Sequence, residues 1–172
     1  MESIINVEFN DVRAIASCIK KEILNSQTSI KNKDYRLNML DFFLLDYCKI
    51  NTENYIFYTD IEQSSLMCIA KIPRQEVSIS SDYAFIECVV KGPNSNITFS
   101  DYLAKALTIK GGKVALGASP KLYNLYTSHG FIFLNKYMED WSRIGDNKLK
   151  ESYTMIFNND HSILIYESPL TS

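Results

Sequence analysis

From Tyr83 onward the sequence alternates apolar, strand-like segments with helix-like ones, and this alternation restricts the fold more than any other feature. Strands joined by a helix pair in parallel through a right-handed crossover. The sequence therefore predicts a parallel pair of strands around Glu87 and Val114. The strand-like segments are 83–91, 113–116, 131–134, 152–157 and 163–166, and the helix-like segments are 100–110 and 120–129.

The first half predicts two amphipathic helices followed by an antiparallel hairpin. Asn10 can cap the first helix, and Asp34 stands near the first turn of the second. Segments 55–59 and 66–72 are rich in aromatic and β-branched residues and flank a turn-like stretch, which is typical of a hairpin. The apolar residues at helical spacing are Val12, Ile15, Ala16, Ile19 and Ile23, then Leu37, Leu40, Leu44 and Tyr47.

The length and the charge balance narrow the class of protein. A chain of 172 residues suits one domain with its own core, so we predict a single domain over residues 1–172. Its 46% hydrophobic and 22% charged residues are close to globular averages, which argues against disorder. Eighteen Lys and Arg against twenty Asp and Glu give a net charge of −2, which disfavours general binding to a nucleic-acid backbone.

No segment predicts a membrane span or a metal site. The apolar run 42–45 is short and lies between Asp41 and Asp46, and the first residues do not form a signal peptide, so we predict a cytoplasmic protein with no membrane partner. The cysteines and histidines lack ligand spacing, which predicts no metal and buried free thiols. These residues are Cys18, Cys48, Cys68, Cys88, His129 and His161.

Segment 125–131, LYTSHGF, resembles the LYxxxGF ending of the fourth helix in the GCN5-related N-acetyltransferases, the GNAT superfamily. The order of elements agrees with that family. The resemblance implies a mixed α/β (α+β) fold whose central mixed sheet is flanked by helices. A strand and two helices would precede the antiparallel hairpin, and acetyl-CoA would lie between two splayed parallel strands. Segment 85–90 resembles the central strand, 100–110 the pyrophosphate-binding helix and 114–116 the second splayed strand.

The resemblance implies an acyl-CoA-dependent N-acyltransferase, an acetyltransferase that moves the acetyl group from acetyl-CoA directly to an amine. Tyr126 matches the family's acid, which protonates the departing thiolate, and the backbone N–H of Val89 or Val90 matches the oxyanion contact. Glu87, the carboxylate of the central strand, can take the amine proton directly or through water. The simpler interpretations are an outward-facing strand residue for Glu87 and a packing tyrosine for Tyr126.

The expected phosphate loop departs from the family's Q/R-x-x-G-x-G/A pattern, because its glycines are absent. Glycine lets the backbone approach a pyrophosphate closely. The N–H groups at the start of a helix capped by Ser100 can still hold an anion, and the loop adds hydroxyl and amide donors. A cofactor-binding loop and a polar loop that only caps a helix both stay open. The residues assigned to the cofactor are Ser95, Asn96, Thr98, Phe99 and Ser100.

The sequence leaves two further interpretations open. A catalytically inactive GNAT-fold binding protein is the alternative from another class, and the missing glycines favour it. An acyltransferase that uses a carrier-bound acyl chain is the third interpretation. The amine acceptor can be a small molecule or a protein, and the oligomeric state stays open. Tyrosines that can line an acceptor cleft are Tyr55, Tyr58, Tyr83, Tyr123 and Tyr137.

Overall fold

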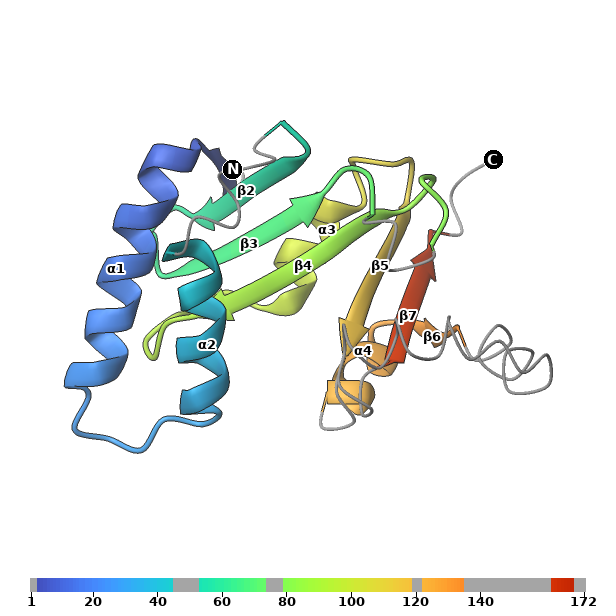
Figure 1. The fold of residues 1–172 in the computed structure, drawn as a ribbon. Coiled ribbons are helices and arrows are strands. Elements are labelled where there is room, and N and C mark those ends of the chain that lie inside the picture. Colours follow the sequence, from blue (N-terminus) through green and yellow to red (C-terminus); the bar gives the residue numbers. More distant parts are fainter. Residues whose placement is uncertain (1–2, 45–52, 74–78, 119–121, 135–161, 169–172) are drawn as a thin grey trace, which may run out of the picture. The chain divides into compact units, whose positions relative to one another are not determined.

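The computed structural model describes residues 3–44, 53–73, 79–118, 122–134 and 162–168, drawn as a ribbon in Figure 1. The elements are β1 (Ile4–Val7), α1 (Phe9–Asn25), α2 (Lys33–Leu44), β2 (Tyr55–Asp60), β3 (Ser65–Ala70), β4 (Ala84–Lys91), α3 (Phe99–Ala106), β5 (Lys113–Ala118), α4 (Tyr123–Ser128), β6 (Ile132–Phe133) and β7 (Ser162–Glu167). The chain divides into two compact units. The first comprises Met1–Ala70 and Glu87–Lys105, and the second comprises Lys71–Ile86 and Ala106–Ser172, so β4 contributes to both.

In the first unit, β1, β2 and β3 form an antiparallel sheet. The predicted hairpin is confirmed, since β2 and β3 pair from Tyr55 opposite Ala70 to Thr59 opposite Leu66. The strand that the resemblance places before the two helices is confirmed as β1, which pairs with β2. Figure 1 shows α1 and α2 on one face of β2, β3 and β4, and α3 on the opposite face. All six residues of β3 are buried, as expected for a strand covered on both faces.

α1 confirms the apolar face that helical spacing predicts. The helix begins after Glu8, whose extended backbone and carbonyl oxygen form the N-cap, so the predicted cap at Asn10 is wrong. Asn10 lies inside the first turn because the Glu8 carbonyl already accepts the N–H of Val12 at 3.2 Å. The residues that α1 buries are Val12, Ile15, Ala16, Ile19 and Ile23.

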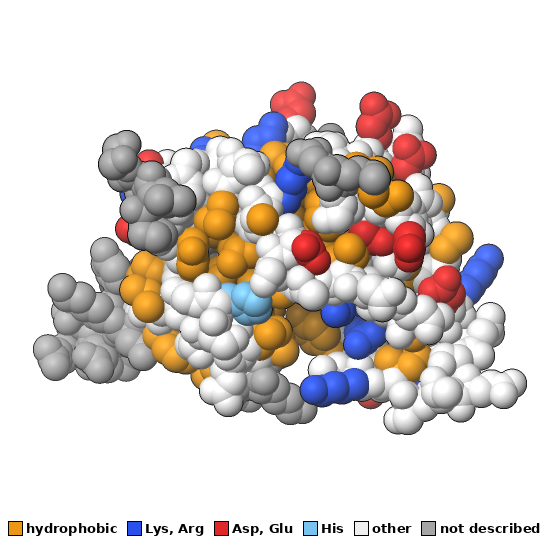
Figure 2. All heavy atoms as spheres, turned by 180° about the vertical axis from the view of Figure 1, so that it is seen from behind, with side chains coloured by type: hydrophobic (Ala, Val, Ile, Leu, Met, Phe, Trp, Pro, Cys, Tyr) orange, Lys and Arg blue, Asp and Glu red, His pale blue; other side chains and the backbone are white. Residues whose placement is uncertain are grey.

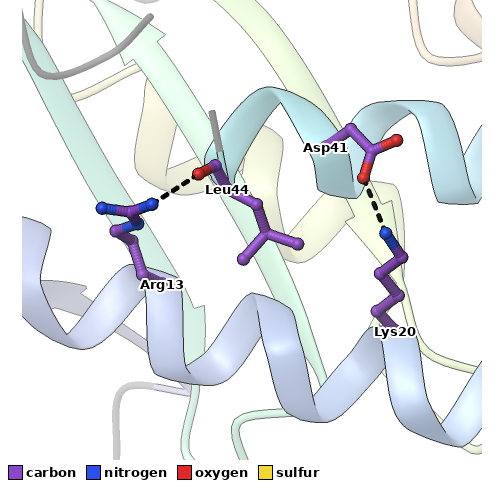
Figure 3. Close-up of polar contacts among 4 residues, drawn as sticks. All are labelled: Arg13, Lys20, Asp41 and Leu44. Atoms are coloured by element: carbon purple, nitrogen blue, oxygen red, sulfur yellow. Dashed lines mark hydrogen bonds and ion pairs between the residues drawn. The ribbon is translucent and has the colours of Figure 1, made fainter. Parts of the chain in front are cut away.

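Polar contacts also join α1 and α2, at the edges of the apolar faces through which the two helices pack. The ammonium of Lys20 lies 2.9 Å from Oδ1 of Asp41, and Nη2 of Arg13 donates to the carbonyl of Leu44 at 2.8 Å (Figure 3). The side chains of the ion pair are 35% and 45% exposed, so solvent screens it and it contributes about 0–1 kcal/mol. The packing of α2 depends instead on residues such as Leu40, which is fully buried.

α3 differs from its prediction in its start and in its buried face. It begins at Phe99, so Ser100 is its second residue and not its cap. Helical spacing in segment 100–110 predicts one face of Leu103, Ala104 and Leu107, but Ala104 is exposed and Leu107 is only half-buried. The buried face shifts because Tyr102 buries its ring and its hydroxyl lies 2.5 Å from the hydroxyl of Ser65. The residues that α3 buries are Tyr102, Leu103 and Ala106.

In the second unit, β4 and β5 form the predicted parallel pair. Ala84 pairs with Val114 and Ile86 pairs with Leu116. β7 pairs antiparallel with β5, and β6 pairs antiparallel with β7. The glycines Gly111-Gly112 have φ values of 61° and 91° in the turn that precedes β5, a backbone conformation that glycine adopts without steric cost.

Hydrogen bonds order the strands as β1-β2-β3-β4-β5-β7-β6. An antiparallel hairpin followed by a parallel pair, with helices at the sheet faces, is the predicted mixed α/β fold class. The single-domain assignment and the splaying of β4 from β5 stay predictions.

Several predictions fall outside the described residues: the start of the helix-like segment 120–129, the strand at 152–157, and the assignments of Tyr47, Cys48, Tyr137 and His161. The prediction of buried free thiols holds for Cys68 and Cys88 and is wrong for Cys18. Cys18 is exposed because it lies beside the apolar stripe of α1, which passes through Ile19.

Candidate active site

The second half of β4 presents Glu87 on the side of the strand that faces α3. Glu87, Val89 and Lys91 alternate with Cys88 and Val90, which are buried. The ammonium of Lys91 donates to the carbonyl of Ile97, in the loop that leads into α3. Glu87 shares that side by strand alternation, and its Oε1 atom is buried.

The loop after β4 is attached to the β2–β3 turn at Gly92. The N–H of Gly92 donates to the carbonyl of Ser64 at 2.7 Å, and Nη1 of Arg36 donates to the carbonyls of Lys91 and Gly92 at 3.0 and 3.3 Å. A Cβ atom at Gly92 would lie 3.0 Å from the Ser64 carbonyl oxygen. Glycine is needed here because the two backbones approach closely.

A buried polar cluster connects the same turn to α3. Asp60, 3% exposed, accepts hydrogen bonds from the N–H of Ser64 at 2.9 Å and from the hydroxyls of Ser64 and Ser65 at 2.8 and 2.7 Å. The Ser64 hydroxyl lies 2.8 Å from that of Ser95, and the Ser65 hydroxyl lies 2.5 Å from that of Tyr102. Charged hydrogen bonds of this kind hold the turn, the loop and the helix in one arrangement.

The start of α3 is held by hydrogen bonds between Thr98, the residue before the helix, and Asp101 in its first turn. Oδ2 of Asp101 accepts from both the N–H and the hydroxyl of Thr98, each at 2.9 Å. In return, the N–H of Asp101 donates to the Thr98 carbonyl at 3.1 Å. The spacing T-x-x-D is a sequence signal of a helix start, so Asp101 could have been identified before the structure was known.

The structure brings the predicted loop residues together on one segment, 95–100, that leads into the first turn of α3. Ser95 and Thr98 make hydrogen bonds within the chain, since the Ser95 hydroxyl also lies 3.4 Å from the N–H of Ile97. A pyrophosphate does not fit on the Thr98 donors while the Asp101 carboxylate accepts them. The cofactor roles of this segment, including Asn96, stay predictions.

Tyr126 lies in the second unit, and the Gly130-Phe131 ending explains its local geometry. Phe131 is 2% exposed, and its ring lies 5.9 Å from that of Tyr126 and 5.5 Å from that of Tyr166. Gly130 ends α4 with φ of 99°, and a Cβ atom there would lie 2.9 Å from Cε2 of Tyr166. Only glycine combines this backbone conformation with this contact. The motif therefore positions Tyr126 half-buried against Phe131.

The other tyrosines predicted to line an acceptor cleft are partly engaged elsewhere. Tyr55 and Tyr58 are buried in the first unit, and burial raises the pKa of Tyr58, against which the nearby Lys105 charge acts. The hydroxyl of Tyr123 donates to that of Ser162 at 2.8 Å, and Tyr83 donates to Glu167.

Three further findings concern surface charge, metal ligands and membrane-spanning helices. On the face drawn in Figure 2, a few Lys and Arg side chains lie together in the lower middle, but those on this face do not gather into one continuous basic field. Among the residues with described positions, no group of three His, Cys, Asp or Glu side chains could hold a metal ion. Within the same residues, none of the helices has the length and apolarity to cross a membrane.

The strand order, the hairpin and the parallel β4–β5 pair are those that the resemblance to the GNAT superfamily implies, so the resemblance is confirmed for the fold. No protein-family model and no curated protein matches the chain. Solved structures that share the fold include the following two. One, described as histone acetyltransferase HPA2 and related acetyltransferase from Corynebacterium glutamicum, is 12% identical, with a TM-score of 0.54 over 99% of this chain and 97% of that chain. A probable acetyltransferase from Staphylococcus epidermidis is 13% identical, with a TM-score of 0.52 over 98% and 99%.

Proposed function

We propose that this protein is an acyl-CoA-dependent N-acyltransferase, an acetyltransferase that moves the acetyl group from acetyl-CoA to an amine by direct transfer. The observation that carries the proposal is the fold shared with two acetyltransferases over nearly the whole of each chain. A fold alone hosts many activities, so the chemistry must come from named residues. Support from particular residues comes from the LYTSHGF segment, which contains Tyr126 and packs its ring against that of Phe131.

The proposed chemistry uses one base, one acid and one backbone donor. Glu87 takes a proton from the ammonium form of the amine, and the neutral nitrogen then bonds to the acetyl carbonyl carbon. The second proton of that nitrogen passes to solvent as the amide forms. The backbone N–H of Val89 or Val90 donates to the oxyanion that develops on that carbonyl. As the carbon–sulfur bond breaks, Tyr126 gives its phenol proton to the thiolate. The reaction needs no metal.

The experiment is a transfer assay that measures thiol release from acetyl-CoA in the presence of diamines, amino acids and peptides with free N-termini or lysines. We expect amine-dependent release with at least one class, and mass spectrometry should find one added acetyl group on that amine. Binding is measured separately by thermal unfolding. Acetyl-CoA at a hundredfold excess over its dissociation constant should stabilise the fold by about 2.7 kcal/mol. Absence of both release and stabilisation would contradict the proposal.

A second candidate is a GNAT-fold binding protein without catalysis. The observation that favours it is the Asp101 carboxylate, which holds the Thr98 donors at the start of α3. This candidate predicts that neither acetyl-CoA nor a carrier-bound acyl thioester stabilises the fold. An enzyme that uses a carrier-bound acyl chain would instead be stabilised by the acylated carrier and by free acetyl-CoA only weakly.

The proposal extends to partners and location. The acceptor is an amine on a small molecule or a protein. The net charge of −2 and the mixed charges in Figure 2 support an acceptor other than nucleic acid in general. We propose a cytoplasmic location, to be checked by fractionation of cells that express the tagged chain.

A further inference from the structure

The start of α3 already holds an anion, and that anion belongs to the chain. One oxygen of Asp101 accepts both donors of Thr98 at 2.9 Å. The neighbouring N–H groups of Ser95 and Ile97 are also used within the loop, by the Gly92 carbonyl at 3.3 Å and the Ser95 hydroxyl at 3.4 Å. A helix start that binds phosphate offers such donors to the ligand. Here the N–H groups of the preceding loop and that of Asp101 in the first turn of the helix are directed to acceptors of the chain itself.

The electrostatics around this helix start point the same way. The carboxylate of Asp101 lies where the positive end of the helix dipole attracts an anion, so it offsets that attraction for any second anion. The pKa of Tyr102 is raised, first by burial and further by the negative charges of Asp60 and Asp101, while its hydrogen bond to Ser65 acts in the opposite direction. Two carboxylates therefore act on the first turn of α3. The ammonium of Lys91 is held 2.9 Å from the Ile97 carbonyl.

We propose that Asp101 takes the place of the cofactor's diphosphate at the start of α3, so that this chain gains little affinity from the nucleotide diphosphate of an acyl-CoA donor. The inference rests on the proposed function and narrows its donor recognition. The inference predicts that this chain hardly distinguishes acyl donors by their nucleotide: an acetyl thioester without the nucleotide diphosphate should bind with nearly the same affinity as acetyl-CoA.

The size of the effect follows from Coulomb's law. A carboxylate about 5 Å from a diphosphate carrying roughly two negative charges repels it enough, even at the dielectric constant of water, to weaken binding about tenfold. Asp101→Asn removes the charge and keeps an oxygen that can accept from Thr98, so the helix start can still form. We therefore expect Asp101→Asn to bind acetyl-CoA about tenfold more tightly than the unchanged protein.

Calorimetry of the full chain with two probes, acetyl-CoA and S-acetyl-pantetheine, tests the inference. Both probes carry the acetyl thioester, and the second lacks the nucleotide and its phosphates. Asp11→Asn is the matched control, because it removes the same charge from the first turn of α1. If Asp101→Asn does not fold, Asp101→Gln replaces it, since a glutamine at this third helical position also offers an acceptor oxygen to the N–H of Thr98.

The expected result is a tenfold gain for acetyl-CoA in Asp101→Asn, less than a twofold change for S-acetyl-pantetheine, and no change for either probe in Asp11→Asn. The variant should also melt at a slightly lower temperature without ligand, because a carboxylate stabilises a helix start. A residue that only caps the helix would lower both the melting temperature and the acetyl-CoA affinity. An unchanged or weakened acetyl-CoA affinity in Asp101→Asn, or no binding to either protein, overturns the inference. Acetyl transfer by the unchanged protein decides the proposed function separately.

Discussion

Gly130→Ala tests the physical reason for the motif that carries the resemblance. The residue has φ of 99°, and an added Cβ would lie 2.9 Å from Cε2 and 3.4 Å from Cδ2 of Tyr166. An alanine held at such a φ costs on the order of 1–3 kcal/mol. The Tyr166 ring must also move, and its contact with Phe131 at 5.5 Å limits where it can go.

Gly111→Ala is the matched control for this substitution. Gly111 also has positive φ, 61°, but nothing lies within 4 Å of its added Cβ. It therefore pays only the left-handed backbone cost of about 1–2 kcal/mol. With strain and contact together, Gly130→Ala should lose about 2–4 kcal/mol.

Urea unfolding of the two variants and the unchanged protein measures both losses, and circular dichroism shows that each variant folds. We expect Gly130→Ala to be less stable than Gly111→Ala by at least about 1 kcal/mol, which is roughly 2–4 °C in melting temperature for a chain of this size. Replacing Tyr166 with Leu should recover part of the difference in a double-mutant cycle. Equal losses at the two glycines would refute the contact with Tyr166 as the reason for Gly130.

Two further predictions address the hydroxyls of single tyrosines. Tyr126→Phe keeps the ring contact with Phe131, so the free energy of unfolding should barely change. We expect kcat to fall by about 10²–10⁴ and the affinity for acetyl-CoA to stay within a small factor. A variant with unchanged kcat would remove Tyr126 from the chemistry. Burial raises the pKa of Tyr102 in the folded protein. In the unfolded chain a tyrosine has a pKa of about 10, so above that pH the unfolded chain loses the Tyr102 proton while the folded protein still keeps it. The free energy of unfolding is therefore full below about pH 10 and falls above it by up to about 1.4 kcal/mol per pH unit, a loss that Tyr102→Phe should reduce in alkaline urea titrations.

The parts of the fold that were predictable are those set by local periodicity. Five residues at helical spacing identify the buried face of α1, and the strand, helix and strand order identifies the parallel β4–β5 pair. The face of α3 was not predictable in this way. It depends on the hydrogen bond between Tyr102 and Ser65, which are 37 positions apart, and no local pattern reports that Tyr102 has a buried partner.

In the candidate site, too, the residues set by local spacing were predictable and those that meet only in the folded chain were not. Tyr126 could be identified because Gly130 and Phe131 follow it at fixed spacing. The T-x-x-D spacing of Thr98 and Asp101 was equally visible and is local. The cluster around Asp60 was not visible, because its members come from a hairpin turn, a loop and a helix that meet only in the folded chain.

The glycines at positions 92 and 130 and the glycines missing from the expected phosphate loop have different physical roles. Gly130 is required by a left-handed backbone and by the Tyr166 ring, and Gly92 by a carbonyl at 3.0 Å from where its Cβ would be. Both demands come from folding, so they hold whether or not a ligand binds. Laid onto the loop pattern that the resemblance implies, Thr98 stands where that pattern has a glycine. A glycine there would serve only a ligand that approaches the backbone. With Thr98 there, the Asp101 carboxylate gains the Thr98 hydroxyl as a second donor beside the Thr98 N–H. A threonine at position 98 therefore stabilises the helix start and weakens the binding of a diphosphate there. Because these two effects differ, the fold and the recognition of the acyl donor must be tested by separate variants.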